Sequence, residues 1–372
     1  MNILHVCGTK RLAGRELFVY KQSLKMRENG HNVFIVARTG FGLGELALEA
    51  KIPCLLYKGG ISRLWFPFQV RNFITKNKID VVHFHQLRLV RRLMPFLPGG
   101  NNRPAYIFTD AAPHPKKITS WLTTKVLEML DLLLVPSESQ RSQAAWALGY
   151  PEDKIKVLGN GVDTQLFCPP NDEDEKKSIR SKYDIPLEIP CISLMARIDK
   201  DKGQDTVIEA AKILVSEGRK FRVEICGDLD TAGKGQTFID EIKIMSEDSL
   251  LNGCVHLRGF VSNVPEYLKT VDLQVLPSTY ESFGFVIAEA MAVGLPVVAT
   301  SVGALPYIIQ PEECGIVVDH SSPKQLASAI ARILDDPRMA AEMGRRGRER
   351  VIERFSLKRH LEEAFKYYDE CR

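Results

Sequence analysis

The amino-acid sequence predicts an α/β protein made of two Rossmann-like, doubly wound domains. Short apolar, β-branched strands recur about every 25 residues with helical segments between them, which is typical of a parallel sheet covered on both faces. The pattern starts again with a new strand at 191–196. A chain of 372 residues is long for one hydrophobic core and comfortable for two. We therefore expect a first domain over residues 1–165 and a second over 166–356.

The first half opens with a strand at 2–6, followed by a flexible turn and a helix at 16–28. Further strands are predicted at 31–37, 53–57, 81–84, 105–109 and 132–135. Gly14 and the amides after it offer a helix N-terminus to an anion, although most doubly wound domains begin with such a loop. The polar, proline-containing segment 168–177 is predicted to link the two domains.

The most informative stretch is 277–301, where a strand, a loop, a helix, a turn and another strand follow one another. Glu281 lies in the loop, and Glu289 lies about one turn inside the helix. The amides of 282–285 are donors at a helix start, where the macrodipole favours an anion. A phosphate on the loop and hydroxyls on the carboxylates together describe a nucleotide sugar. Two solvated glutamates in a βαβ unit are the alternative interpretation.

Residues 277–299 read PSTYESFGFVIAEAMAVGLPVVA, and this run resembles the E-x7-E signature of the retaining family-four glycosyltransferases. The turn KVLGNGVD at 156–163 and the R-x4-K-G loop at 197–203 resemble two further motifs of that family. The resemblance implies the GT-B fold, with two domains facing a cleft. It also implies a donor domain over the second half, an acceptor domain over the first, and a closing helix at 357–372 that crosses back to the first domain.

The resemblance assigns roles to the matched residues. Arg197 and Lys202 would bind the donor pyrophosphate and stabilise the departing nucleotide, because arginine offers a planar fork of donors and lysine a point charge. Glu281 would hold sugar hydroxyls and Glu289 the ribose. The residues expected to bind the donor are Gly14, Arg197, Lys202, Phe260, Val261, Glu281, Ser282, Phe283, Gly284 and Glu289. Those expected to act in catalysis are Arg197, Lys202, Glu281 and Asp110.

The strand at 105–109 ends where similar enzymes carry a T-x-H step near the sugar. Here Asp110 follows Thr109, and the nearest histidine is His114. Asp110 is the first candidate to accept a hydrogen bond from a sugar or acceptor hydroxyl, and His114 is the second. Both residues are otherwise ordinary loop residues.

No metal and no cofactor other than the nucleotide-sugar substrate are expected. Two loose D-x-D patterns occur at 199–201 and 228–230, but the cations of the 197–203 loop already supply positive charge beside the first. His83 and His85 point to one face of their strand, and no third ligand is visible near them in the sequence. A core or hydrogen-bonding role is therefore preferred for both.

The two halves of the chain differ in charge. Residues 1–165 carry 23 Lys and Arg against 12 Asp and Glu, and the remainder carries 27 against 34. The basic half favours an anionic partner such as a membrane surface, and plain solubility is the alternative. The segments 61–74 and 87–97 interleave aromatic and cationic residues, which suits the headgroup layer of a bilayer or simply a helix packed on a sheet. No motif indicates nucleic-acid binding.

Cysteine usage and hydropathy bear on location. The eight cysteines form no C-x-x-C pair, which favours buried thiols in a reducing cytoplasm. Neither a signal peptide nor an apolar run of ~20 residues is recognisable. We expect a cytoplasmic protein, peripheral on the inner face of the plasma membrane.

The resemblance implies retaining hexosyl transfer from a UDP- or GDP-sugar to an acceptor hydroxyl, and no metal is expected to take part. A lipid-linked or cell-envelope saccharide, as in lipopolysaccharide biosynthesis, suits the basic, aromatic first half. A soluble small acceptor is the alternative. Less favoured are a phosphorylase or epimerase of the same fold and a non-catalytic binding module. Because no carboxylate nucleophile is well placed in the sequence, front-face attack by the acceptor is the preferred mechanism.

Overall fold

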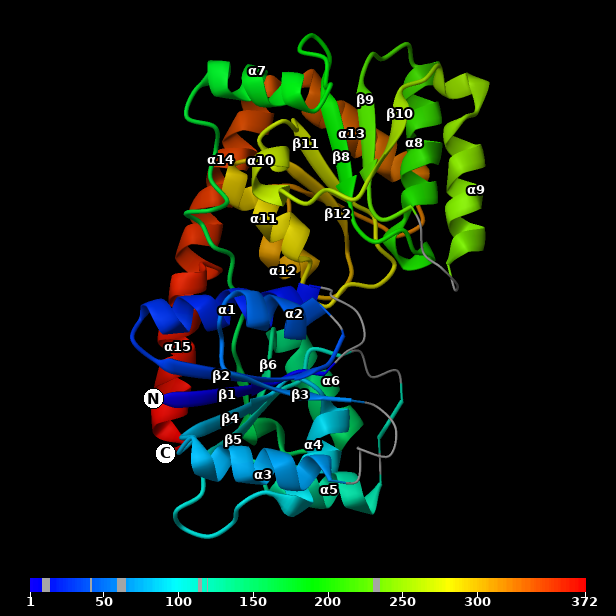
Figure 1. Ribbon diagram of the computed structural model, residues 1–372. Helices are drawn as coiled ribbons and strands as arrows, with labels where there is room; N and C mark the ends of the chain where they lie inside the picture. Colours follow the sequence, from blue (N-terminus) through cyan, green and yellow to red (C-terminus); the bar gives the residue numbers. More distant parts are fainter. Residues whose placement is uncertain (9–13, 41, 59–64, 113–115, 119, 230–234) are drawn as a thin grey trace. The chain divides into compact units, whose positions relative to one another are not determined.

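The computed structural model describes residues 1–8, 14–40, 42–58, 65–112, 116–118, 120–229 and 235–372. The chain forms two compact units (Figure 1). The first comprises Met1–Asn160 and Lys358–Arg372, and the second comprises Gly161–Leu357. The division thus lies at 160/161, where the sequence analysis placed it at 165/166. Each unit is a parallel sheet with helices on both faces, so the predicted pair of doubly wound α/β domains is confirmed.

The first unit contains a seven-stranded parallel sheet in the order β3-β2-β1-β4-β5-β6-β7. Its strands are β1 (Asn2–Val6), β2 (Asn32–Arg38), β3 (Cys54–Tyr57), β4 (Val81–Phe84), β5 (Ala105–Thr109), β6 (Leu132–Val135) and β7 (Ile155–Val157). The chain builds outward from β1 in one direction and from β4 in the other. The strand order therefore reverses between β1 and β4, which is where doubly wound sheets open a crevice at their carboxyl edge.

Side chains alternate between the two faces of this sheet. Val36 of β2 packs in the core beneath α3–α6, while its neighbours Ile35 and Ala37 pack against α1 and α2 on the other face. The helices of the unit are α1 (Gly14–Glu28), α2 (Gly42–Glu49), α3 (Phe66–Lys76), α4 (Leu87–Leu93), α5 (Trp121–Glu128) and α6 (Glu138–Leu148), with 3-10 turns at Met94–Phe96 and Glu152–Lys154.

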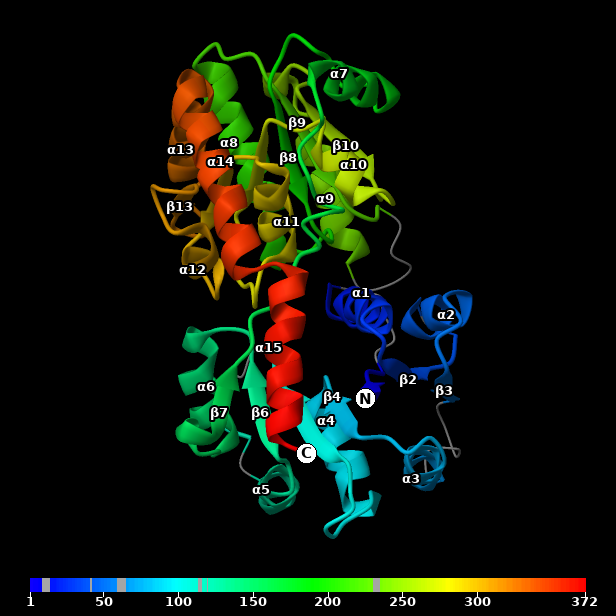
Figure 2. The same cartoon turned by 90° about the vertical axis from the view of Figure 1, so that its left-hand side faces the viewer.

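The final helix α15 (Leu357–Glu370) belongs almost wholly to the first unit, as Figures 1 and 2 show. Tyr368 is fully buried, and its hydroxyl is 2.7 Å from Nδ1 of His83 in β4. His360 contacts the carbonyl of Gly159 at 2.6 Å and Gln22 of α1 at 3.2 Å. The C-terminal segment thus completes the core of a unit that the chain had left some 200 residues earlier.

The second unit contains a six-stranded parallel sheet in the order β10-β9-β8-β11-β12-β13. Its strands are β8 (Cys191–Met195), β9 (Arg222–Cys226), β10 (Val255–Gly259), β11 (Leu273–Leu276), β12 (Val297–Thr300) and β13 (Ile316–Val318). Its helices are α7 (Glu173–Lys182), α8 (Gln204–Ser216), α9 (Gln236–Ser246), α10 (Val264–Leu268), α11 (Phe285–Val293), α12 (Leu305–Ile309), α13 (Pro323–Asp335) and α14 (Pro337–Arg354), with 3-10 turns at Lys200–Lys202 and Ser249–Leu251. Here the order reverses between β8 and β11.

The predicted linker at 168–177 is wrong over its second half, because helix α7 begins at Glu173. The side chain of Asp172 accepts a hydrogen bond from the amide of Glu175 at 2.8 Å and so caps the helix. Three acidic residues of the segment, Glu173, Asp174 and Glu175, occupy the first turn, where the macrodipole favours negative charge. Arg180 of the same helix is buried and pairs with Asp272, which ties α7 to the unit.

None of the helices within the described ranges has the length and apolar character that a membrane crossing requires.

Candidate functional site

Three loops meet at the carboxyl edge of the second sheet. They follow β8, β11 and β12, which are neighbours in the sheet, and span 196–203, 277–284 and 301–304. Because the strands are parallel, their carboxyl ends lie at one edge. The loops after β8 and β11 also flank the point where the strand order reverses, which is where open α/β sheets bind ligands.

Two glycines bring these loops into backbone contact. Gly203 has φ +72°, and a Cβ there would lie 2.4 Å from the carbonyl oxygen of Pro277. Gly303 has φ +56°, and a Cβ there would lie 1.7 Å from the carbonyl oxygen of Glu281. No other residue fits at either position without moving a neighbouring backbone. The amide of Thr279 donates to the carbonyl of Asp201 at 3.0 Å, which joins the first two loops further.

Lys202 and Glu281, which the sequence analysis placed in one site, are in direct contact. Lys202 Nζ is 2.6 Å from Oε2 of Glu281, and the two side chains are 15% and 18% exposed. Oε1 of Glu281 accepts a hydrogen bond from the amide of Ser282 at 3.1 Å. The carboxylate is therefore held by a cation on one oxygen and a backbone donor on the other, with its orientation fixed before any ligand arrives.

Arg197 begins the same loop and is exposed. Its guanidinium lies 3.1 Å from Oδ2 of Asp199, and its carbonyl accepts a hydrogen bond from Nε2 of the buried Gln204 at 2.8 Å. The backbone at Arg197 is thus anchored while the charged end reaches solvent. An exposed pairing of this kind contributes little to stability and exchanges readily for a ligand anion.

Helix α11 starts beside the Lys202–Glu281 pair. Gly284 precedes it in the left-handed region at φ +85°. The side chain of Phe283 is only 2% exposed and packs against the rings of Phe285 and Phe355, so only its backbone can face a ligand. Glu289 is half-buried and is the one charged residue in the otherwise apolar sequence of this described helix.

Phe260 and Val261 follow β10, the edge strand on the far side of β9. Phe260 is 77% exposed, whereas Val261 is half-buried. The strand end beneath them is held by a buried carboxylate. Glu224 of β9 is fully buried and accepts from Arg222 at 2.5 Å and from Arg258 at 2.6 Å. The hydrogen bonds that Arg258 donates to Glu224 raise the pKa of Arg258.

Sequence reasoning missed Glu224, Gly303 and Gln204. An acid inside the apolar strand sequence RVEIC was a usable signal for Glu224, because a charge at such a position needs a partner. Nothing local marked Gly303 or Gln204, because their importance lies in contacts with residues of other segments.

Two of the predicted site residues belong to the first unit. Asp110 follows β5 and is 3% exposed; its amide donates to the carbonyl of Leu134, and its Oδ1 accepts from the amide of Ala112 at 3.3 Å. Gly14 is the first residue of α1. His114 and Asp230 lie outside the described residues.

The expectation that His83 and His85 have no third ligand nearby is wrong. His5 on the adjacent strand β1 joins them, and one ring nitrogen of each lies within 4.8 Å of the others. Their geometry is nevertheless that of a hydrogen-bonded core: His5 contacts His85 at 3.1 Å, and His83 contacts Thr109 and Tyr368 at 2.7 Å each. A metal ion would have to displace these contacts. Burial lowers the pKa of His5 to about 3, so the ring is neutral.

Two family models match the chain. Residues 175–350 match the family model of the Glycosyl transferases group 1, and residues 13–166 match that of Glycosyltransferase Family 4. A D-inositol 3-phosphate glycosyltransferase of Corynebacterium glutamicum is 32% identical over 226 residues, which are 59% of this chain and 53% of the relative. The chain thus spans about half the length of this relative.

Solved structures share the architecture. A glycosyltransferase from Rickettsia africae has a TM-score of 0.86 and 21% identity, covering 100% of this chain and 98% of its own. HepE of Anabaena, solved in complex with UDP-glucose, has a TM-score of 0.83 and 18% identity, with 100% of both chains covered. At these identities the likeness shows the fold, which is the GT-B fold expected from the sequence. Since the two family models together span most of the chain, the protein belongs to the family-four, group 1 glycosyltransferases.

Proposed function

We propose that the protein transfers a hexosyl group, with retention of anomeric configuration, from a nucleotide sugar to an acceptor hydroxyl. The observation that carries the proposal is the Lys202–Glu281 pair, held 2.6 Å apart at the edge where three glycine-locked loops meet. A cation for phosphate oxygens and an oriented carboxylate for sugar hydroxyls are the two groups that a nucleotide sugar requires. Both stand beside the start of a helix, whose dipole adds positive potential.

The proposed chemistry breaks the bond between the anomeric carbon and the diphosphate. Positive charge grows on the sugar and negative charge on the leaving group, and Arg197 and Lys202 stabilise the latter. The acceptor oxygen bonds to the anomeric carbon on the face from which the diphosphate departs, and its proton passes to the departing phosphate. Because both oxygens of Glu281 already accept hydrogen bonds, its proposed role is to position hydroxyls rather than to attack carbon.

The donor is proposed to be a UDP- or GDP-sugar and to bind without metal. HepE, which shares the fold, was solved with UDP-glucose, and this favours uridine. Thermal-shift screening of the purified protein against UDP-, GDP- and ADP-sugars in EDTA tests the assignment, because a ligand that binds the native state raises the midpoint. A shift that needs added Mg²⁺ would overturn metal independence, and no shift with any donor would contradict the proposed site.

The acceptor is proposed to be lipid-linked or part of a cell-envelope glycan, reached from the inner face of the plasma membrane. Three neighbouring aromatic residues of the first unit support this. Trp65, Phe68 and Phe96 are 68%, 49% and 42% exposed, and successive ring centroids lie 6.1 and 5.6 Å apart. Exposed aromatic rings on a basic domain suit a headgroup layer. Sedimentation with anionic vesicles, lost on changing Trp65 and Phe68 to serine, is the expected result.

A soluble, small acceptor is the second candidate. It is favoured by the corynebacterial relative, whose name specifies inositol 3-phosphate. If the protein fails to sediment with vesicles but glycosylates a soluble sugar or cyclitol, this candidate replaces the first.

A further inference from the structure

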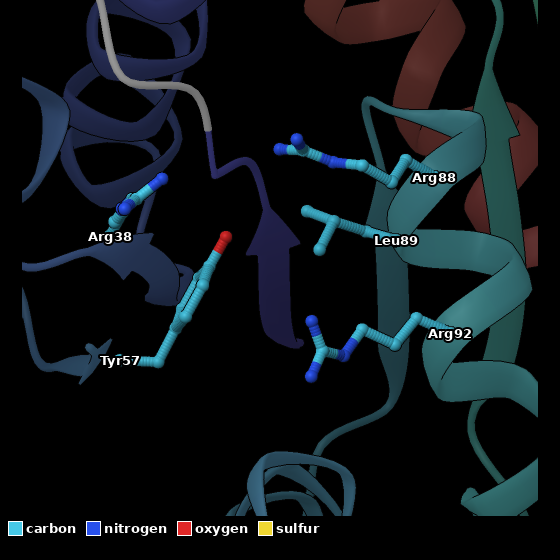
Figure 3. Close-up of a pocket in the computed structure, with 5 residues that line it drawn as sticks. All are labelled: Arg38, Tyr57, Arg88, Leu89 and Arg92. Carbon is cyan, nitrogen blue, oxygen red and sulfur yellow. The ribbon is translucent and has the colours of Figure 1, made fainter. Parts of the chain in front are cut away.

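The first unit contains a pocket that the donor site does not use. It has a volume of about 120 Å³ and is lined by Arg38, Tyr57, Arg88, Leu89 and Arg92 (Figure 3). This volume is far above the roughly 10–15 Å³ that one water molecule needs. It is large enough for a phosphate-sized group.

The pocket lies at the carboxyl edge of the first sheet. Arg38 is the last residue of β2 and Tyr57 the last of β3, while Arg88 and Arg92 stand on α4, directly after β4. In the sheet β1 separates β2 from β4, so the walls come from both sides of the point where the strand order reverses. Figure 3 shows Arg38 and Tyr57 facing the α4 residues across the pocket. Ligands of doubly wound domains bind at such an edge.

Contacts with the end of β1 fix two of the lining side chains. Arg88 Nη2 donates to the carbonyl of Gly8 at 3.0 Å, and the Tyr57 hydroxyl donates to the same carbonyl at 3.2 Å. A Cβ at position 8 would lie 2.1 Å from that hydroxyl, so the approach requires glycine. Arg92 lies over the ring of Phe66 at 5.8 Å. The donors are therefore held in place before a ligand binds.

The lining is strongly cationic. It brings three guanidinium groups together, and none of the described lining residues is acidic. Burial raises the pKa of Tyr57 although the three arginines lower it, so the hydroxyl stays protonated and brings no negative charge into the pocket. Like charges gathered in one pocket repel one another, and an anion relieves that repulsion. Guanidinium groups match the oxygens of a phosphate in geometry as well as in charge.

We propose that this pocket binds a phosphate group carried by the acceptor substrate. The inference rests on the proposed function, since it names the class of acceptor that the transferase uses. The phosphate is not a reacting group. It anchors the acceptor through Arg38, Arg88 and Arg92, and this binding energy orients the hydroxyl that attacks the donor. A soluble sugar phosphate and a phosphate-linked lipid glycan share this chemistry.

Binding is measured by calorimetry with the full chain. The probes are glucose 1-phosphate and myo-inositol 1-phosphate, with glucose and myo-inositol as their uncharged counterparts, and vesicles of phosphatidylcholine with or without phosphatidic acid. We expect the phosphorylated probes to bind and the uncharged ones not to. Binding of the soluble phosphates assigns a soluble acceptor, and binding only to phosphatidic acid vesicles assigns a lipid source.

The substitutions Arg88→Met and Arg38→Met should each weaken phosphate binding about 10- to 100-fold, the usual effect of losing a charged hydrogen bond. Tyr57→Phe keeps the ring packing and should weaken it less. The control is Arg91→Met, on the same helix and exposed but outside the lining. If a methionine variant does not fold, Tyr57→Phe and the salt dependence of wild-type binding carry the test. Equal losses in Arg91→Met and Arg88→Met would overturn the proposal.

A parallel titration with the UDP-sugar separates the two hypotheses. If the UDP-sugar binds but no phosphorylated probe does, the pocket inference is wrong and the proposed function stands. If the UDP-sugar does not bind while the phosphates do, the proposed donor site fails and the pocket remains an anion site. The Arg88 and Arg38 variants should bind the UDP-sugar as wild type does.

Discussion

The two units differ in which charged side chains they bring together. In the second unit the important charges are matched inside the protein: Lys202 pairs with Glu281, and the buried Glu224 is held by two arginines. In the first unit three arginines line one pocket whose described lining residues include no acid, and burial keeps His5 neutral. A matched site is preorganised for one chemistry and depends on a motif. A pocket lined by several cations favours an anionic ligand, and its residues belong to none of the motifs recognised in the sequence.

The largest expected effect comes from breaking the matched pair. Glu281→Gln leaves the shape of the side chain but removes the charge that orients Lys202, and kcat/KM should fall by about 10³-fold or more. The measurement is steady-state transfer with the cognate UDP- or GDP-sugar, alongside a melting curve to show that the fold survives. Glu349→Gln, an exposed acid on α14, is the control and should leave kcat/KM unchanged. Full activity of the Glu281→Gln variant would contradict the assignment of Glu281 to the site.

A stability change of about 3–5 kcal/mol is expected from Glu224→Gln, because it leaves the charges of Arg222 and Arg258 without a buried partner. Urea unfolding monitored on the second unit measures the loss. The matched comparison is Asp335→Asn, whose carboxylate pairs with Arg219 at the surface, with 60% of the side chain exposed. That substitution should cost well under 1 kcal/mol. Similar losses for both variants would show that burial of Glu224 does not decide its importance.

A smaller effect, dependent on pH, is expected in the first unit. Burial lowers the pKa of His360 to about 4, below the usual 6.5, so the unfolded chain binds a proton that the folded chain refuses. This contribution to stability is fully present above pH 6.5 and is lost as the pH falls towards 4. At pH 5 the loss of stability amounts to about 2 kcal/mol relative to pH 8.

The difference between unfolding free energies at pH 8 and pH 5 measures this contribution. It should shrink in His360→Gln and stay unchanged in His320→Gln, which replaces an exposed histidine of the second unit. An unchanged pH dependence in His360→Gln would mean that the other buried histidines, or the carboxylates, govern acid unfolding.

Local sequence patterns predicted several strands and the start of one helix correctly. The strands at 81–84, 105–109 and 132–135 have the bounds expected, and the helix that carries Glu289 begins after the glycine that the motif places there. The polar segment 168–177 was wrongly predicted to be a linker over its second half, because a linker and a capped helix start with an acidic first turn have similar compositions.

The remaining features arise from contacts between distant segments. The arginine pocket joins residues 38, 57 and 88–92, none of which forms a motif with the others. His5 completes the histidine cluster only because β1 lies beside β4, 78 positions away in the register. Such neighbours follow from strand order, and strand order is decided by packing of the whole unit rather than by the residues concerned.

The close backbone contacts at Gly203 and Gly303 limit which substitutions the three loops can accept as the sequence diverges. With carbonyls where their side chains would be, these positions tolerate no substitution without moving a loop, and the three loops behave as one rigid part. Divergence in ligand preference is therefore confined to side chains that project from that part, such as the partly exposed Tyr280. New ligand specificities can arise by single amino-acid substitutions on an unchanged backbone. Insertions into these loops would instead break the backbone contacts that hold the site together.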